Sequence, residues 1–447
     1  MKIFFTLRDM NKWLLIFTVL LIFTAQKAQA QKARFDSKII LPFQNEHVHG
    51  STLVELPNGD ILAAWYQGSG ERQASDVKIL GARKKYGNDT WSTPFEMGDV
   101  KTFPDCNPVL FLDGKNRLWL MWYTIIANQW DTSLLKYQIS EHYSNMLGVP
   151  EWDWQSDLIV KPGNSGGFGI QPGDSFVTSV KKQVHDYKKI YQSSDAAKSF
   201  ESWSNDLLDK AEGKNMVRDG RIYHKDGSYE KAQLGYPYFR RMGWQTRNKP
   251  FITESGRMIL PLYSDGFSFS LMAYTDDWGK TWNYSNPLVG DGNIQPAIAE
   301  TKSGNLVAYM RDNGPAPKRL HISRSTDDGE TWSEVKDTSI PNPGSAADIV
   351  TLKNGDWVLI YNDTESGRNS LAVAISQDDG KSWPWKRRIE YDNSDAPRLA
   401  HYPAIIQGHD GLLHVTYSYY LPNKNHKERQ TIKYAVFNET WIKEGDQ

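Results

Sequence analysis

A short motif occurs three times in the second half of the chain at a nearly constant spacing. Each copy follows the pattern Ser/Thr-x-Asp-x-Gly-x-Thr/Ser-Trp, and the copies begin at Thr275, Ser325 and Ser376. The aspartates of successive copies lie 50 and 51 residues apart. A fixed period of this length indicates a repeat architecture. The residues suit a tight β-turn, because Asp accepts backbone N–H groups, Gly adopts positive φ and Trp packs over the turn.

A second repeat extends this pattern over most of the chain. It consists of an apolar run, a turn with Gly after Asn, Asp or Ser, and another apolar run, which is typical of a β-hairpin. A third strand-like run follows each hairpin. One hairpin, a third strand, a boxed turn and an outer strand make a four-stranded blade, so six copies predict an all-β, six-bladed β-propeller. The hairpins are residues 52–65, 109–122, 251–263, 297–310, 348–361 and 404–417.

Residues 141–246 interrupt this rhythm. Phe176, Val180 and Val184 recur at helical spacing, and so do the apolar residues of 200–207. The spacing predicts a helical insertion at about residues 170–235, between blades two and three. Two alternatives remain open from the sequence: residues 195–200 could be a degenerate boxed turn, and the region could hide a seventh blade.

The N-terminus has the layout of a targeting segment. Basic residues precede an apolar run of 12 residues, 13–24, which is too short to span a bilayer, and Ala28-Gln29-Ala30 is a small-x-small cleavage site. We therefore expect a signal peptide at residues 1–30, a single domain at 31–447, and export to the periplasm or the outside of the cell. An uncleaved membrane anchor is the alternative.

Composition limits the partners. The net charge of −1 provides no global field for nucleic acid or an anionic membrane. Cys106 is the only cysteine, so stability must come from the core rather than from an internal disulfide. Aromatic residues make up 13% of the chain, which suits both strands and surfaces that stack on sugars.

The three boxed segments resemble the Asp-boxes of the sialidase superfamily, and the resemblance covers roughly residues 40 to 440. It implies a β-propeller. In such a fold the residues just before and just after each inner hairpin converge on one mouth, and loops on a rigid scaffold are where sites usually lie.

At this mouth we predict a pocket for an acidic oligosaccharide, because arginine forks bind carboxylates bidentately and aromatic rings stack on sugars. The predicted substrate-binding residues are Arg72, Arg247, Gln295, Arg311, Arg368 and Tyr417. The predicted catalytic residues are His47, His49, Asp76, His401 and Tyr402. Arg72, Arg311 and Arg368 could instead be structural ion pairs with Glu71, Asp312 and Glu365.

Sialidases use three arginines on the substrate carboxylate, a tyrosine nucleophile assisted by a glutamate, and an aspartic acid as proton donor. By this resemblance Arg311 and Arg368 look like two of the arginines, Tyr402 looks like the nucleophile, and Asp76 is similar in place to the acid.

The chain departs from that pattern at two places. The first arginine belongs in an Arg-Ile-Pro motif at the opening of blade one, where this chain has His47-Val48-His49. The activating glutamate belongs at the opening of blade four, where this chain has Gln295. An amide cannot act as a base, so Tyr402 lacks its usual partner.

These departures favour β-elimination on a uronate. An arginine would neutralise the carboxylate, a His or Tyr would remove the C5 proton, and a second His or Tyr would protonate the group leaving C4. Some Asp-box propellers that resemble this chain are uronate lyases of this kind, and elimination of water would make a dehydratase. The alternatives are a retaining exo-glycosidase of sialidase type and a non-catalytic glycan-binding propeller. The sequence indicates no cofactor and no metal-ligand spacing, and it leaves the oligomeric state open.

Overall fold

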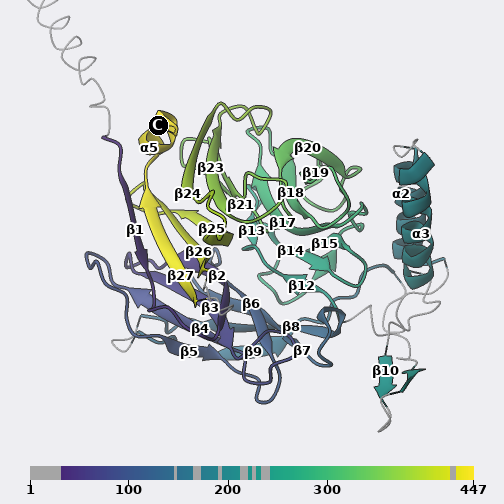
Figure 1. Cartoon of the computed structure of the whole chain (residues 1–447), viewed down its shortest axis with the longest axis horizontal. Helices are drawn as coiled ribbons and strands as arrows, with labels where there is room; N and C mark the ends of the chain where they lie inside the picture. Colours follow the sequence, from purple (N-terminus) through teal and green to yellow (C-terminus); the bar gives the residue numbers. More distant parts are fainter. Residues whose placement is uncertain are drawn as a thin grey trace, which may run out of the picture.

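The structure is a computed structural model that describes residues 32–144, 148–164, 173–189, 194–211, 220–223, 228–232, 242–422 and 429–446. Six antiparallel sheets form a ring around a common axis (Figure 1). The predicted six-bladed β-propeller is confirmed. The predicted signal peptide, residues 1–30, lies outside the described residues.

Each blade has an inner strand at the axis and an outer strand at the rim. Blade one is β2 (His47–Glu55), β3 (Ile61–Gly68), β4 (Lys78–Lys84) and β5 (Phe95–Gly98), and blade two is β6 (Asp105–Leu112), β7 (Leu118–Ile125), β8 (Ser133–Ser140) and β9 (Trp154–Asp157). Blade three is β12 (Gln245–Thr246), β13 (Phe251–Ile252), β14 (Met258–Ser264), β15 (Phe269–Thr275) and β16 (Asn283–Tyr284). Blade four is β17 (Asn293–Glu300), β18 (Leu306–Asp312), β19 (Arg319–Ser325) and β20 (Lys336–Pro341). Blade five is β21 (Asp348–Thr351), β22 (Trp357–Tyr361), β23 (Ser370–Ser376) and β24 (Trp385–Tyr391).

Blade six closes the ring with strands from both ends of the described chain. It contains β25 (Leu399–Gln407), β26 (Leu413–Leu421) and β27 (Arg429–Phe437), and its outer strand is β1 (Phe35–Ile39). β1 pairs antiparallel with β27, from Phe35 opposite Phe437 to Ile39 opposite Lys433. The residues after β27 form the short helix α5 (Glu439–Glu444) instead of an outer strand. This pairing joins the first and last blades through backbone hydrogen bonds.

The boxed turns have the geometry that their residues predict. In the first copy the Asp277 carboxylate accepts the Thr281 backbone N–H at 2.8 Å and the Thr281 hydroxyl at 2.7 Å. Trp278 and Gly279 have φ of 61° and 86°. Asp327 and Asp378 make the same backbone contact, at 2.9 Å each, so the three turns are one repeated structure.

The described apolar residues do not form a single central core. Instead, six apolar clusters of described residues each fill the seam between two neighbouring blades. The cluster between blades one and two contains Cys106, which is fully buried. Face-to-face packing around a closed ring removes the exposed sheet faces that a single blade would leave.

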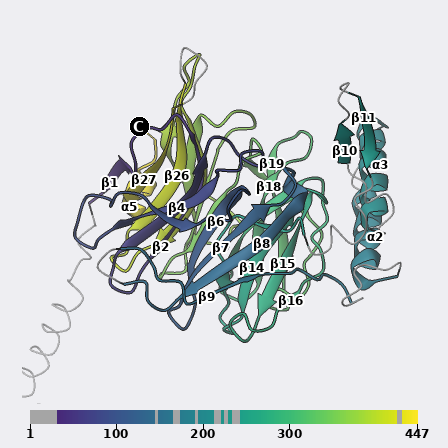
Figure 2. The same cartoon turned by 90° about the horizontal axis from the view of Figure 1, so that it is seen from below.

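The helical insertion follows blade two, as predicted, and consists of α2 (Ser175–Lys188) and α3 (Ser194–Ala211), with a short pair formed by β10 (Gly220–Tyr223) and β11 (Tyr229–Ala232). The helices lie side by side at the outer wall of the propeller (Figure 2). Phe176 packs on Phe267, and the Gln183 amide donates to the Pro287 carbonyl at 2.6 Å. Residues 195–200 lie within α3, so the boxed-turn alternative is wrong. Within the described ranges, no helix has the length and apolar character needed to cross a membrane.

The boxed-turn geometry generates a prediction about stability. Gly380 has φ of 77°, and a Cβ there would lie 2.8 Å from Cζ3 of Trp357. Gly304 has a similar φ of 80°, but a Cβ would meet nothing within 4 Å. We expect Gly304→Ala to lower the free energy of unfolding by about 1 kcal/mol and Gly380→Ala by about 2–4 kcal/mol in urea titrations. Equal losses of unfolding free energy in the two variants would show that the turn at Gly380 is not closely packed against Trp357.

Candidate active site

A cavity of about 340 Å³ lies at the axis, where the openings of the blades meet. Its lining comes from all six blades and is polar and aromatic. The lining residues are His49, Tyr66, Glu71, Asn107, Tyr123, Trp130, Tyr263, Asp265, Gln295, Arg311, Asn313, Arg368 and Tyr402. The prediction that His49, Arg311, Arg368 and Tyr402 converge on one pocket therefore agrees with the geometry.

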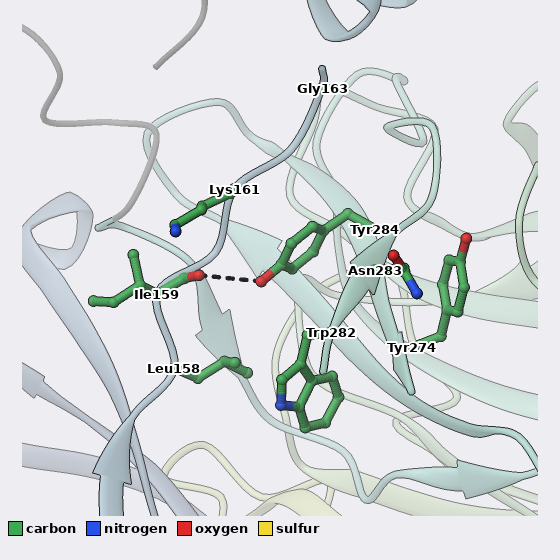
Figure 3. Close-up of a pocket in the computed structure, with 8 residues that line it drawn as sticks. All are labelled: Leu158, Ile159, Lys161, Gly163, Tyr274, Trp282, Asn283 and Tyr284. Atoms are coloured by element: carbon green, nitrogen blue, oxygen red, sulfur yellow. Dashed lines mark hydrogen bonds between the residues drawn. The ribbon is translucent and has the colours of Figure 1, made fainter. Parts of the chain in front are cut away.

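A second cavity, of about 450 Å³, lies at the outer edge of blade three (Figure 3). Three aromatic rings line it, and the Tyr284 hydroxyl donates to the Ile159 carbonyl at 3.1 Å. Its described lining contains no carboxylate, histidine or arginine. General acid–base chemistry needs titratable groups near each other, and the axial cavity brings such groups together from all six blades. We therefore take the axial cavity as the candidate active site.

The axial site is built on a bulge that four inner strands share. The pairing register shifts by one residue between His49 and Thr52, and at the equivalent places in blades two, four and six. The extra residue has positive φ each time: 65° at Gly50, 48° at Asn107, 55° at Gln295 and 54° at Tyr402. A β-bulge redirects a side chain, and here it turns three of these residues into the axial cavity.

Tyr402 occupies the centre of this arrangement. Its phenol oxygen accepts a hydrogen bond from Arg311 Nη1 at 2.7 Å and another from Gln295 Nε2 at 3.3 Å. The guanidinium of Arg368 lies 5.4 Å from the ring centre. Burial by itself raises the pKa of Tyr402, but the charges of Arg311 and Arg368 outweigh it, and the pKa lies below its ordinary value of 10.0.

Arg311 and Arg368 are the cations that face the cavity. Arg311 Nη2 donates to Asn313 at 3.0 Å, and Arg368 Nη2 donates to the Gly344 carbonyl at 2.8 Å. Among the described residues, neither guanidinium forms an ion pair with a carboxylate. Two half-buried arginines that pair with no carboxylate among the described residues make a site that favours an anionic ligand.

Three histidines cluster beside Tyr402, with their rings tilted or edge-on to each other. The His49 ring lies 4.3 Å from the Tyr402 ring and 4.8 Å from the His401 ring, and His47 lies 5.5 Å from His49. Arg368 donates to His401 Nδ1 at 3.1 Å, so a neutral His401 carries its proton on Nε2. Burial, reinforced by neighbouring cations, lowers the pKa of both His49 and His401 well below 6.5. Both rings are therefore neutral at neutral pH.

Two carboxyl groups in the cavity have opposite environments. Burial favours the neutral form of Glu71, but contacts with His47 at 3.0 Å and with the Tyr66 hydroxyl at 2.7 Å contribute to a pKa of about 2. Burial raises the pKa of Asp265, against the opposing effect of Arg311. Carboxyl groups whose pKa values diverge in this way are suited to different roles in acid–base chemistry.

The comparisons with known proteins agree with this geometry. Residues 242–415 match the family described as a BNR repeat-like domain. The anhydrosialidase of Macrobdella decora is 26% identical over 192 residues, and the sialidase of Micromonospora viridifaciens is 26% identical over 213 residues. These segments are 39% and 45% of this chain. These matches and the propeller fold support a sialidase-superfamily β-propeller with BNR repeats.

The fold likeness extends further than the sequence likeness. The intramolecular trans-sialidase from Ruminococcus gnavus superposes with a TM-score of 0.55 at 16% identity, over 89% of this chain and 95% of that one. The aligned segments amount to only 25% of the Macrobdella protein and 30% of the Micromonospora protein. The chain thus spans less than a third of the length of these curated members of the superfamily.

Three residues that the sequence assigned to the site have other surroundings. Asp76 lies at the exposed rim of the loop after β3, where its carboxylate accepts the Ser69 N–H at 3.1 Å and the Ser69 hydroxyl at 2.8 Å. Tyr417 is fully buried and donates to Glu390 at 2.7 Å, because alternation along β26 turns it towards blade five while Ser418 faces His49. Arg247 is also buried, beneath Tyr402 rather than in the open cavity.

The sequence left open structural ion pairs of Arg72, Arg311 and Arg368 with nearby carboxylates. Among the described residues, none of these three ion pairs forms. Glu365 pairs with Arg319 at 2.6 Å, and Asp312 contacts Lys318 and His321. Arg72 instead lies over the Trp130 ring, 5.4 Å from its centre, next to the cavity.

The sequence prediction omitted Glu71, Asp265 and Asn107 from the site residues, although all three line the cavity. One signal could have found the bulge: Asn107, Gln295 and Tyr402 each precede a proline, at Pro108, Pro296 and Pro403. Proline within a sheet is largely confined to edges and bulges, so a repeated proline in inner strands marks the bulged position. In the described part of the chain, no group of three or more His, Cys, Asp or Glu residues is arranged to hold a metal ion.

The buried neutral histidines predict a pH dependence of stability. The unfolded chain binds a proton at each histidine near pH 6.5, whereas folded His401 does not, so stability is present above pH 6.5 and lost as the pH falls. Asp312 and Asp337 raise the pKa of His321 to about 8 against the effect of burial, so protonation of His321 stabilises the folded state. Because His321 and His401 change the stability in opposite directions as the pH falls, a His401 variant must be compared with the wild type.

We expect His401→Asn to reduce the loss of unfolding free energy between pH 7.5 and pH 5.5 by about 1.4 kcal/mol relative to the wild type. Urea titrations at the two pH values measure this difference. His185→Asn, on the exposed face of α2, is the control and should leave the pH dependence unchanged. An unchanged difference in His401→Asn would mean that His401 binds its proton equally well in the folded and unfolded chains.

Proposed function

We propose that this protein is a carbohydrate-active enzyme that binds an acidic sugar at the axial cavity and reacts at the carbon that bears its carboxylate. The observation that carries this proposal is the 2.7 Å hydrogen bond from Arg311 to the Tyr402 oxygen, in a cavity where Arg311 and Arg368 have no carboxylate partner among the described residues. The names of the related sialidases support a glycan as substrate.

The position of Tyr402 selects the reacting carbon. A substrate carboxylate would bind to Arg311 and Arg368 and neutralise their charges. The substrate carbon attached to that carboxylate would then lie beside the Tyr402 oxygen. In a uronate that atom is C5, which carries an acidic hydrogen. In a sugar derived from an α-keto acid it is the anomeric carbon. In this position the Tyr402 oxygen would act as a base on the uronate and as a nucleophile on the sugar derived from an α-keto acid.

Elimination from a uronate is our first candidate. Tyr402 as the phenolate takes the C5 proton, the electron pair forms the C4–C5 double bond, and the C4–O bond breaks. Asp265, whose pKa burial raises, gives its proton to the departing oxygen. Gln295 favours this reaction: among the described residues no carboxylate hydrogen-bonds the Tyr402 oxygen to remove its proton during attack, so Tyr402 works best when it is already ionised.

Glycosyl transfer of sialidase type is the second candidate, favoured by the relatives. The Tyr402 oxygen attacks the anomeric carbon, Asp265 protonates the leaving oxygen, and water then releases the sugar from Tyr402 with Asp265 as base. Both candidates place the same residues around the carboxylate, and they differ in their products. Elimination gives an unsaturated uronic acid without added water, whereas hydrolysis adds one water.

Mass spectrometry of products from a panel of acidic oligosaccharides tests the proposal. We expect turnover that Tyr402→Phe lowers by about 10²–10⁴-fold in kcat/KM, because the phenol oxygen is the reacting group. Tyr417→Phe is the matched control: it removes a buried phenol oxygen remote from the cavity and should keep near-normal activity. Binding of a glycan without any turnover would identify a binding propeller and overturn the enzymatic proposal.

The carboxylate requirement can be tested on the substrate as well. Chemical reduction of the carboxyl group to an alcohol removes the charge-assisted contacts with two guanidinium groups, which are worth about 1.5–3 kcal/mol each. We expect kcat/KM to fall by about 10²–10⁴-fold on the reduced substrate. Arg311→Ala should remove most of this discrimination, while Arg319→Ala, which breaks an ion pair with Glu365 at the rim, should preserve it. Equal rates on both substrates would exclude carboxylate recognition.

A further inference from the structure

Arg247 lies directly beneath Tyr402, in the segment that joins β12 to β13. Its side chain is 1% exposed, and its guanidinium lies 5.1 Å from the centre of the Tyr402 ring. Among the described residues it forms no ion pair with a carboxylate. A fully buried cation without a counter-ion is costly to desolvate, so its position needs a reason.

The first reason is the backbone of the bulge. Arg247 Nη2 donates to the Tyr402 carbonyl at 2.6 Å and to the Pro403 carbonyl at 3.2 Å. These two carbonyls flank the strained turn of the chain, where Tyr402 has φ of 54°. A bulky residue in this conformation is uncommon, and it persists only where its surroundings fix it. One guanidinium holding both carbonyls fixes the direction in which the Tyr402 side chain leaves the strand.

The second reason is charge. The titratable groups that face Tyr402 come from every element around it, and the cations outnumber the anions. They are Arg311 on β18, Arg368 before β23, His49 on β2, His401 on β25, Glu71 after β3 and Tyr263 on β14, with Arg247 below the ring. His49 and His401 are neutral, so the arginines determine the local potential.

We propose that Arg247 is a positioning residue that holds Tyr402 in the bulged conformation and stabilises its ionised phenol from below, in place of the carboxylate base that Gln295 cannot supply. The proposal rests on the proposed function of Tyr402 as the reacting group. It also accounts for the buried, unpaired state of Arg247: the counter-charge appears when the phenol ionises. The burial that lowers the pKa of Arg247 is opposed by Tyr402, which is consistent with this coupling.

The test measures the titration of Tyr402 directly and needs no substrate. Protein labelled with ¹³C at tyrosine Cζ is titrated by NMR, and the Tyr402 resonance is assigned by its loss in Tyr402→Phe. Arg247→Gln removes the charge and keeps an amide N–H donor, whereas Arg247→Lys keeps the charge and loses the planar guanidinium group. Arg257→Gln is the matched control, because it removes a guanidinium that lies 4.3 Å from a different tyrosine, Tyr274.

We expect Arg247→Gln to raise the titration midpoint of Tyr402 by about one pH unit or more, and Arg247→Lys and Arg257→Gln to leave it nearly unchanged. If Arg247→Gln does not fold, Arg247→Met fills the same volume without a buried amide and gives the same expected shift. A shift below about 0.3 pH unit in the charge-removing variant, or an equal shift in Arg247→Lys, would overturn the electrostatic role. Absence of turnover on every sugar would contradict the proposed function and leave this titration result intact.

Discussion

The site depends on one backbone irregularity, the single-residue bulge in the inner strands of blades one, two, four and six. A regular inner strand would turn alternate side chains into the seams between blades, where the apolar clusters lie. The bulge breaks this alternation at the mouth and turns Asn107, Gln295 and Tyr402 towards the axis. The rigid ring holds these residues in register with the arginines at the ends of the neighbouring strands.

The electrostatics of the cavity follow from that convergence. The guanidinium groups of Arg247, Arg311 and Arg368 lie 5.1, 6.0 and 5.4 Å from the centre of the Tyr402 ring, and burial keeps the neighbouring histidines neutral. The phenol oxygen accepts two N–H donors, and the orientation of Gln295 is fixed because its amide oxygen accepts from Arg311 at 3.3 Å. An environment of donors and cations stabilises the anion of a group more than its neutral form.

This chain combines a propeller scaffold similar to that of sialidases with its own set of polar groups. Tyr402, Arg311 and Arg368 line the axial cavity, whereas a histidine pair stands at the opening of blade one and the amide of Gln295 at the opening of blade four. The scaffold alone does not define the reaction, since one fold hosts many chemistries. The neutral histidines, the ionised Glu71 and the raised pKa of Asp265 define which protons can move in this cavity.

Much of the architecture was readable from local sequence. The boxed turns and the Gly-containing hairpins are determined by short-range hydrogen bonds and by positive φ, so their repetition gave the blade number and the position of the helical insertion. The same periodicity placed Arg311, Arg368, His49 and Tyr402 at one mouth. The outer strand of blade six was not predicted, because β1 precedes β27 by nearly the whole chain.

The sequence by itself determined the repeat, the blades and the set of residues near the axis, because each depends on neighbours within one hairpin. Only the tertiary structure decided which of those residues face the cavity. Alternation along β26 turns Tyr417 away from the cavity, whereas Arg247, Glu71 and Asp265 lie in segments between strands, whose paths the repeat pattern does not define. The tertiary structure also decided the protonation states, since these depend on burial and on charges contributed by blades far apart in the chain.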